Sequence, residues 1–310
     1  MDYRQHKSSG LSISAIGFGC WQMGLKWWPG TRQEDTTAAV ACAIEEGINL
    51  YDTADVYGFG HSEKALAEAL GNKSKNVIIS SKAGLKWDDR GRVTHNLSKQ
   101  HILKAADDSL KRLRRDHIDI YFAHWPDDRT PIADTMEAFN LLKQAGKIRF
   151  TGLSNFDKQR ISEARKYDKI HFIQPPYNLL QRAYETETLP YCLEQDIGVF
   201  SYSSIGKGLL TGKFTKTSSF GKKDIRRFDE LFSDENFSVN IEIIEKLKRF
   251  GDINGLSLLD MAIAWILKNK AVKSALVGIK KSSQLKEIIQ ASKTIINDPL
   301  YDDINRLVRN

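Results

Sequence analysis

The sequence predicts an α/β fold, specifically a (β/α)8 TIM barrel, on the basis of three observations. Eight short apolar runs alternate with amphipathic helical segments from about residue 15 to about residue 290, a pattern typical of successive βα units. The runs are too continuously hydrophobic for a sheet with one solvated face, which indicates parallel strands. The residues from the end of the first run into its turn, Gly17–Gln22, lack the third glycine of an open dinucleotide-binding sheet. Eight units in order favour a closed barrel.

The expected strands are short runs rich in β-branched and aromatic residues: Ala15–Phe18, Ile48–Tyr51, Val77–Ser81, Ile118–Ala123, Ile148–Leu153, Phe172–Gln174, Gly198–Tyr202 and Ala275–Val277. Apolar residues at helical spacing predict the helices between them: Asp35–Glu45, Ser62–Leu70, Ser98–Leu113, Ala133–Ala145, Lys158–Lys166, Glu185–Glu194, Leu258–Leu267 and Gln284–Ala291. We expect Ser98 to cap the third helix, because a serine hydroxyl accepts a hydrogen bond from the first turn. Gly47, Gly71 and Gly146 stand where helices end.

Two segments extend the minimal barrel. Residues Tyr3–Ile13 contain a turn at Ser8–Gly10, which predicts an N-terminal β-hairpin that closes the bottom of the barrel. A long loop after strand 7, Gly206–Ser257, greatly exceeds the roughly 2–6 residues usual for such loops, and includes a helical part at Ile241–Phe250. We expect it to be a lid or binding loop. No linker or repeat divides the chain, so residues 1–310 are expected to form a single domain.

Composition excludes several classes of protein. The chain has 310 residues, of which 41% are hydrophobic and 27% charged, as in ordinary globular proteins. It has no apolar window of about 18 residues and no apolar secretory signal, so we expect a cytoplasmic protein without membrane contact. The three cysteines are widely spaced, which indicates neither a disulfide framework nor a zinc site. The net charge of +7 comes from scattered Lys and Arg, and we expect no nucleic-acid partner.

Polar residues stand at the ends of three consecutive expected strands. Asp52, Lys82 and His124 end these strands, and Tyr57 follows Asp52 in a loop. Active sites of this fold lie at the carboxyl ends of the strands, so we expect the four side chains to converge. A phenol has a pKa near ~10, and a neighbouring ammonium lowers it. The group therefore predicts protonation of an oxygen by Tyr57.

In this reading each of the other three residues has a role. Lys82 lowers the pKa of Tyr57, Asp52 is the counter-ion that keeps Lys82 charged, and His124 donates a hydrogen bond to a substrate oxygen. Metal-dependent hydrolysis is the rival chemistry, and it needs several His and carboxylate ligands at strand ends. Only His124 meets that condition, and no Gly-x-Ser-x-Gly nucleophile motif occurs, so we expect no metal and no serine nucleophile.

Four longer motifs resemble, in order, those of the aldo-keto reductases: Asn49–Gly58 followed by Ser62 and Glu63, Gly146–Phe156, Gln174–Asn178 and Gly206–Lys213. The phrase Ala123–Asp127 and the long loop are most similar to the bacterial branch typified by general stress protein 69. The resemblance implies an NADP(H)-dependent oxidoreductase that reduces aldehydes or ketones to alcohols by hydride transfer. It assigns the catalytic tetrad to Asp52, Tyr57, Lys82 and His124, with Tyr57 as proton donor.

The resemblance also implies the residues that bind the cofactor: Cys20, Trp21, Asp52, Ser154, Asn155, Gln174, Tyr202, Ser203, Ser204, Ile205, Gly206, Lys207, Lys213, Arg226, Gly278, Lys280 and Gln284. Among them Tyr202 is expected to stack on the nicotinamide. Lys280, at the start of the last helix, is the candidate for the ribose 2′-phosphate, which favours NADPH over NADH. Ile288 replaces a frequent asparagine, so the contacts to adenine are not predicted.

Tryptophans in the loops after strands 1, 3 and 4 predict an apolar substrate pocket for a small carbonyl compound. They are Trp21, Trp28, Trp87 and Trp125, together with Trp27. Two alternatives remain open at this point. One is an NADP(H)-binding regulatory subunit of the channel β-subunit type with little turnover, and the other is a nucleic-acid binder. The sequence leaves the oligomeric state and the physiological substrate undetermined.

Overall fold

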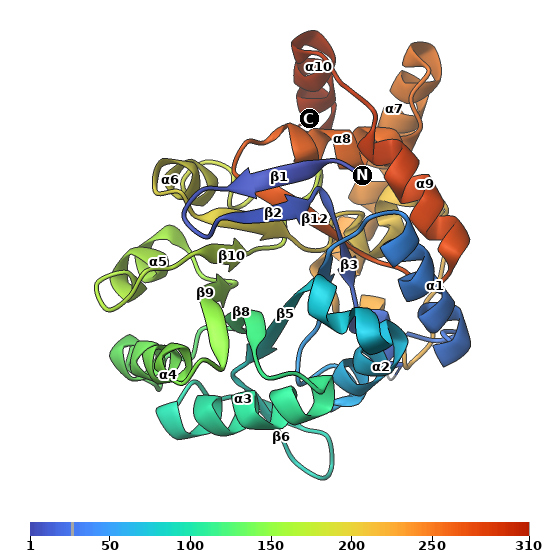
Figure 1. Cartoon of the computed structure of the whole chain (residues 1–310). Coiled ribbons are helices and arrows are strands. Elements are labelled where there is room, and N and C mark those ends of the chain that lie inside the picture. The colour runs from blue at the N-terminus through green and yellow to red at the C-terminus, as the bar shows by residue number, and fades with distance from the viewer. Residues whose placement is uncertain (26–27, 310) are drawn as a thin grey trace.

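The computed structural model describes residues 1–25 and 28–309, and within them eight parallel strands close into a barrel (Figure 1). The barrel strands are β3 (Ile16–Gly19), β4 (Leu50–Asp52), β5 (Ile78–Ala83), β8 (Ile118–Ala123), β9 (Ile148–Ser154), β10 (Phe172–Gln174), β11 (Gly198–Ser201) and β12 (Val272–Gly278). Each pairs in parallel with the next along the chain, and β12 pairs with β3. The predicted (β/α)8 barrel is confirmed, and all eight expected strands are present.

Helices surround the barrel (Figure 1). They are α1 (Gln33–Glu45), α2 (His61–Leu70), α3 (Lys99–Leu113), α4 (Ile132–Gln144), α5 (Lys158–Ala164), α6 (Thr188–Glu194), α7 (Asp234–Asn254), α8 (Leu258–Lys268), α9 (Ser282–Ser292) and α10 (Asp298–Arg309). Short 3-10 segments are η1 (Trp21–Gly24), η2 (Gly71–Asn76), η3 (Gly206–Thr211), η4 (Ile225–Phe228) and η5 (Glu230–Phe232). The Ser98 hydroxyl accepts from the His101 backbone N–H at 3.4 Å, as predicted for a cap.

Helix α10 was not predicted from the sequence. It follows the eighth βα unit, where a minimal barrel would end, and it packs through a few contacts. Ile304 is buried, and the Trp265 indole N–H donates to Asn305 at 2.9 Å. Its apolar residues stand at helical spacing and pack against the core, so a local signal for this helix was present in the sequence: Leu300, Tyr301, Ile304, Leu307 and Val308.

The N-terminal hairpin closes one end of the barrel. Strands β1 (Tyr3–His6) and β2 (Leu11–Ser14) pair antiparallel and cross this end in Figure 1. Ile13 is 0% exposed and belongs to an apolar cluster with inward-facing strand residues, among them Leu50, Phe122 and Phe172. The predicted plug is therefore confirmed.

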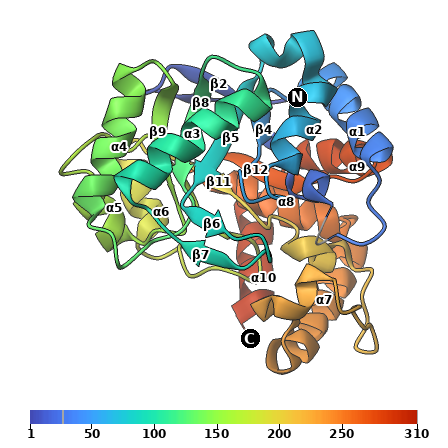
Figure 2. The ribbon, with the colours of Figure 1, turned by 90° about the horizontal axis from the view of Figure 1, so that it is seen from below.

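The opposite end of the barrel carries two further features (Figure 2). A second hairpin, β6 (Leu85–Trp87) with β7 (Val93–His95), follows β5 and was not predicted. The long segment after β11 has its own small aromatic cluster, because Phe214, Phe220, Phe232 and Phe237 contact one another with ring centroids 5.1 to 5.9 Å apart. The loop is therefore held by packing of its own.

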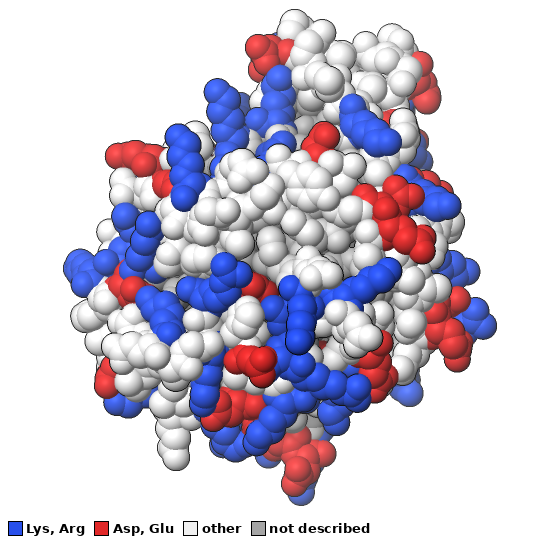
Figure 3. Space-filling view, in the orientation of Figure 1, with Lys and Arg blue, Asp and Glu red and all other residues white. Residues whose placement is uncertain are grey.

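No single helix in the described part of the chain is long and apolar enough to cross a membrane. The bent pair α7 and α8, at 94°, passes by length and composition alone, and most of α8 is buried in the protein core. On the face that carries β1 and β2, Lys and Arg are interspersed with Asp and Glu around the periphery, and uncharged side chains cover the centre (Figure 3). The positive net charge is thus distributed over this face.

Candidate active site

The four residues expected to converge do so at the carboxyl ends of β4, β5 and β8. The Lys82 ammonium lies 2.7 Å from the Asp52 carboxylate and 5.1 Å from the centroid of the Tyr57 ring. The Tyr57 and His124 rings are 5.8 Å apart and nearly perpendicular, at 76°. Strand register accounts for the meeting, since the ends of neighbouring parallel strands share one rim.

The Lys82–Asp52 ion pair is buried, and both of its members make further hydrogen bonds. Lys82 is 0% exposed, and its Nζ also donates to the Thr53 carbonyl at 2.8 Å. Asp52 Oδ2 accepts from Lys82, and Oδ1 accepts from Ser80 Oγ at 2.7 Å and Gln174 Nε2 at 2.8 Å. Such partners offset the cost of removing two charges from water.

The loop that carries Tyr57 is held by a contact between two main chains. Gly58 has a φ of +61°, and a Cβ there would lie 2.4 Å from the Gly24 carbonyl oxygen. Only glycine tolerates both the left-handed backbone and this approach. The Trp21 ring stacks on the Tyr57 ring at 5.9 Å, so the phenol is positioned from two sides.

Burial sets the protonation states of Tyr57 and His124. It raises the pKa of the Tyr57 phenol well above its usual value, and the Asp52 charge acts in the same direction. The net shift is therefore opposite to the acidification expected from Lys82, because burial of the phenol outweighs the ammonium beside it. Burial, and then the Lys82 charge, lower the pKa of His124 well below its usual value. At neutral pH Tyr57 thus holds its proton and His124 is a neutral imidazole.

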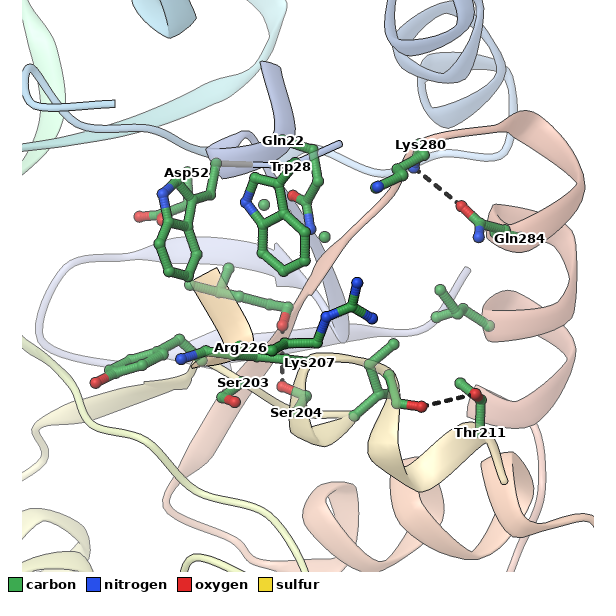
Figure 4. Close-up of a pocket in the computed structure, with 18 of the residues that line it drawn as sticks. Gln22, Trp28, Asp52, Ser203, Ser204, Lys207, Thr211, Arg226, Lys280 and Gln284 are labelled. Atoms are coloured by element: carbon green, nitrogen blue, oxygen red, sulfur yellow. Dashed lines mark hydrogen bonds between the residues drawn. The ribbon is translucent and has the colours of Figure 1, made fainter. Parts of the chain in front are cut away.

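A cavity of about 380 Å³ extends from Asp52 and Tyr57 to the start of α9 (Figure 4). It is lined by most of the residues predicted for cofactor binding: Trp21, Asp52, Gln174, Tyr202, Ser203, Ser204, Ile205, Lys207, Lys213, Arg226, Gly278, Lys280 and Gln284. Four predicted residues do not line it: Cys20, Ser154, Asn155 and Gly206. The predicted set is therefore largely brought together around one cavity.

Two of the residues outside the lining support those at its edge. Asn155 Nδ2 donates to the His124 carbonyl at 2.9 Å, and Asn155 Oδ1 accepts from the Tyr202 hydroxyl at 2.8 Å. Ser154 Oγ donates to the Gln174 carbonyl at 3.0 Å. Asn155 has a φ of 66°, a conformation that is sparsely populated outside glycine. These bonds position His124, Tyr202 and Gln174 relative to one another.

Three cations gather at the far end of the cavity. Lys213, Arg226 and Lys280 line it, and the Arg226 and Lys280 side chains point into the same open part of Figure 4. Asp224 pairs with Arg226, its Oδ1 accepting at 2.8 Å. In the described part of the chain no carboxylate lies within ion-pair distance of Lys213 or Lys280. Burial, followed by the charges of Arg226 and Lys213, lowers the pKa of Lys280. This end therefore favours an anion.

Lys207 was predicted to hold the cofactor from the loop after strand 7, and in the structure its ammonium also pairs with a carboxylate of the protein. It forms an ion pair with Asp229 on the long loop, and its ammonium lies 5.4 Å from the Trp21 ring centroid. Burial lowers the pKa of Lys207 to about 8. The pair attaches the long loop to the wall of the cavity.

Sequence reasoning missed several lining residues, namely Gln22, Thr211, Leu259 and Glu287. Gln22 is the most informative, because its buried Oε1 has no hydrogen-bond partner in the described part of the protein. A Cβ on Gly278 would lie 1.9 Å from Gln22 Nε2, so the glycine leaves room for this amide. The signal that could have identified Gln22 was its position directly after Trp21, in the loop that follows the first barrel strand, β3.

The predicted tryptophan pocket is divided. Trp21 and Trp28 line the cavity and meet edge to face at 5.3 Å. Trp87 stacks on Phe59 at 5.4 Å, and Trp125 is 39% exposed beside His95; neither lines this cavity. Trp27 lies outside the described residues. Residues 1–25 and 28–309 hold no group of three His, Cys, Asp or Glu that could bind a metal.

Comparison with known proteins assigns the fold and the site to a family. Residues 15–309 match the sequence pattern of the Aldo/keto reductase family. The chain is 35% identical to the aldo-keto reductase YhdN of Bacillus subtilis, covering 100% of this chain and 94% of that one. It is 33% identical to an NADH-specific methylglyoxal reductase of Escherichia coli, with 93% and 92% covered.

A solved structure of another enzyme has the same fold as this chain. The glycerol dehydrogenase AKR11B4 from Gluconobacter oxydans superposes with a TM-score of 0.89 at 32% identity, covering 99% of this chain and 95% of that one. The expected bacterial branch is consistent with the Bacillus relative. The chain therefore belongs to the aldo/keto reductase family.

Proposed function

We propose that this oxidoreductase reduces small aldehydes or ketones to alcohols with NADPH, and that Tyr57 supplies the proton. The family uses a nicotinamide cofactor and small carbonyl substrates. The observation that carries the assignment of roles is geometric. Tyr57 and Asp52 line one end of a cavity whose other end holds three cations, and Lys82 and His124 lie directly behind them, outside the lining, paired with Asp52 and packed on Tyr57.

The cavity fits a nicotinamide dinucleotide. Lys213, Arg226 and Lys280 would hold its phosphates, and the unpartnered Gln22 amide beside Gly278 has polar atoms free for it. The Tyr202 ring, fixed through Asn155, would lie against the nicotinamide. When bound, the cofactor supplies the hydride that reduces the carbonyl carbon.

The protein side of the reaction is acid catalysis at the carbonyl oxygen. His124 orients this oxygen by a hydrogen bond, and Tyr57 transfers its hydroxyl proton to it as negative charge develops. The resulting phenolate is stabilised by the Lys82 ammonium, 5.1 Å from the ring centroid. Asp52, at 2.7 Å, is the counter-ion of this buried ammonium.

Replacing Tyr57 by phenylalanine tests this role. We expect Tyr57→Phe to lose at least about a hundredfold in kcat, within the range of general acid catalysis, and to bind NADPH with nearly unchanged affinity. Steady-state reduction of an aromatic aldehyde and fluorescence titration of NADPH measure the two quantities. Full activity in Tyr57→Phe would remove the phenol from the mechanism.

The preference for NADPH rests on Lys280. A charge-assisted hydrogen bond contributes about 1.5–3 kcal/mol. Lys280→Ala should therefore lower the affinity for NADPH about 10- to 100-fold and the affinity for NADH far less. Lys286 lies on the same helix, is exposed and does not line the cavity, which makes Lys286→Ala a matched control. Equal losses for NADPH and NADH in Lys280→Ala would refute the assignment to the 2′-phosphate.

The substrate class and the subcellular location are further proposals, drawn from the cavity lining and from the composition. Trp21 and Trp28 at the cavity favour apolar or aromatic carbonyl compounds, which a panel of aldehydes, ketones and quinones would test by NADPH oxidation. Composition supports a cytoplasmic protein. A regulatory role of the channel β-subunit type is not favoured, since probable potassium-channel β subunits are 30% and 29% identical to this chain, less than the 35% and 33% of the two reductases described above.

A further inference from the structure

A second cavity lies beside helix α3, separate from the reductase cavity. Its volume is about 470 Å³, and it is enclosed by α3, by strand β6 with the residues after β7, and by the loop between Asp52 and Tyr57. The two cavities share no lining residue among those that the structure describes. Trp87, predicted for the substrate pocket, lines this second cavity.

The floor of the cavity is an unsatisfied carboxyl group. Asp55 is 1% exposed, and its Oδ1 has no hydrogen-bond partner in the described protein. Burial, and then the nearby Glu63 charge, raise the pKa of Asp55 well above its usual value. His101 Nε2, which is also buried and unpartnered, lines the same cavity. Two orphaned polar groups in one cavity indicate a missing partner.

The charges around the cavity favour an anion. Arg112 is paired with Glu63 at 2.6 Å, and Lys104 with Asp108 at 2.6 Å. Lys86 is exposed, and within residues 1–25 and 28–309 no carboxylate lies within ion-pair distance of it. After burial, the Lys86 and Lys104 charges are what lower the pKa of His101, so both ammonium groups lie near that ring.

The location of these groups sets the orientation of a ligand. Lys86 and Lys104 are exposed and mark the mouth, and Asp55 is buried and marks the floor. The first turn of the 15-residue helix α3 also borders the cavity, and its positive end adds to the attraction for an anion. Between mouth and floor, the Trp87 ring offers an apolar wall.

We propose that this cavity binds an aromatic carboxylate that carries a hydroxyl group at its far end. The carboxylate is held at the mouth by Lys86, the ring packs along Trp87, and the hydroxyl forms hydrogen bonds with the buried polar atoms of Asp55 and His101. An inorganic anion would satisfy only the mouth. The proposal does not depend on the reductase activity, because it involves another cavity.

Calorimetric titration with 4-hydroxybenzoate on the full chain saturated with NADPH tests the site. We expect saturable binding below about 10 mM, and a loss of about tenfold or more in Lys86→Glu, where attraction becomes repulsion. Lys111 lies on α3 outside the cavity lining with its side chain 79% exposed, so Lys111→Glu should bind within about twofold of the parent. Trp87→Leu should lower the affinity for 4-hydroxybenzoate. Acetate, which lacks the ring, should show no detectable binding to either the parent or this variant.

Each alternative result overturns the proposal. Absence of saturable binding would mean that water satisfies Asp55 and His101. If Lys86→Glu bound 4-hydroxybenzoate as tightly as the parent, Lys86 would not hold the carboxylate. If inorganic phosphate bound as tightly as 4-hydroxybenzoate, the aromatic ring would not contribute to recognition. Loss of binding in Lys280→Glu would place the ligand in the reductase cavity instead.

Discussion

Replacing Lys82 by methionine would leave the Asp52 carboxylate without its counter-ion. In the protein Asp52 Oδ2 accepts from Lys82 at 2.7 Å, and Oδ1 accepts from Ser80 and Gln174. The variant keeps the two donors on Oδ1 and loses the charge that compensates the carboxylate. Methionine has a similar length and shape, so the change is mainly electrostatic.

The expected cost follows from the burial of the pair. Lys82 is fully buried, and breaking a buried ion pair by removing one partner costs about 3–5 kcal/mol. A typical domain is stable by only about 5–15 kcal/mol, so the loss is a large fraction of the total. The deficit should shrink as the pH falls, because a lone buried carboxylate takes up a proton and becomes neutral.

Urea unfolding at about pH 8 and about pH 5 measures both effects. The double variant Asp52→Asn/Lys82→Met removes both charges, and it should recover most of the lost free energy, since a neutral replacement of a buried pair is often tolerated. Lys111→Met, at an exposed lysine, should change stability by no more than about 0.5 kcal/mol. A loss of under about 1 kcal/mol in Lys82→Met, or no recovery in the double variant, would refute the reasoning.

Three further predictions use the same structure. Gly58→Ala places a Cβ 2.4 Å from the Gly24 carbonyl oxygen, so it should displace Tyr57 and lower kcat at least about tenfold; an unchanged kcat would contradict this. Burial lowers the pKa of His171 to about 4, so the folded state binds fewer protons than the unfolded chain, and this group should contribute about 2 kcal/mol to the fall in unfolding free energy between about pH 7.5 and about pH 5. In urea melts of His171→Gln the fall should be smaller by that amount, and an unchanged fall would contradict the assignment. Because burial raises the pKa of Tyr57, alcohol oxidation, which needs the phenolate, should accelerate between about pH 7 and about pH 10 and carbonyl reduction should not; parallel pH profiles would argue against it.

The predictions made from the sequence were incomplete where residues distant along the chain determine the contacts. Asp52 and Lys82 could be placed at strand ends from local patterns, and their pairing followed from the order of the strands. The Gln174 amide that completes the Asp52 site is 122 residues away along the chain, and its hydrogen bond to Asp52 had no local signal. The hairpin β6–β7 and helix α10 were missed because both lie outside the repeating βα pattern, although α10 carries apolar residues at helical spacing.

What the sequence by itself determined was the barrel, its plug and the set of side chains at its rim. Hydrophobic period, helix caps and strand order are properties of neighbouring residues, and they suffice to bring Tyr57, Lys82 and His124 to one edge. Only the tertiary structure decided that Tyr57 keeps its proton, that Trp87 faces a second cavity and that Lys207 pairs with Asp229. Protonation and pairing depend on how much water and charge surround each group, and those surroundings form only when distant segments pack together.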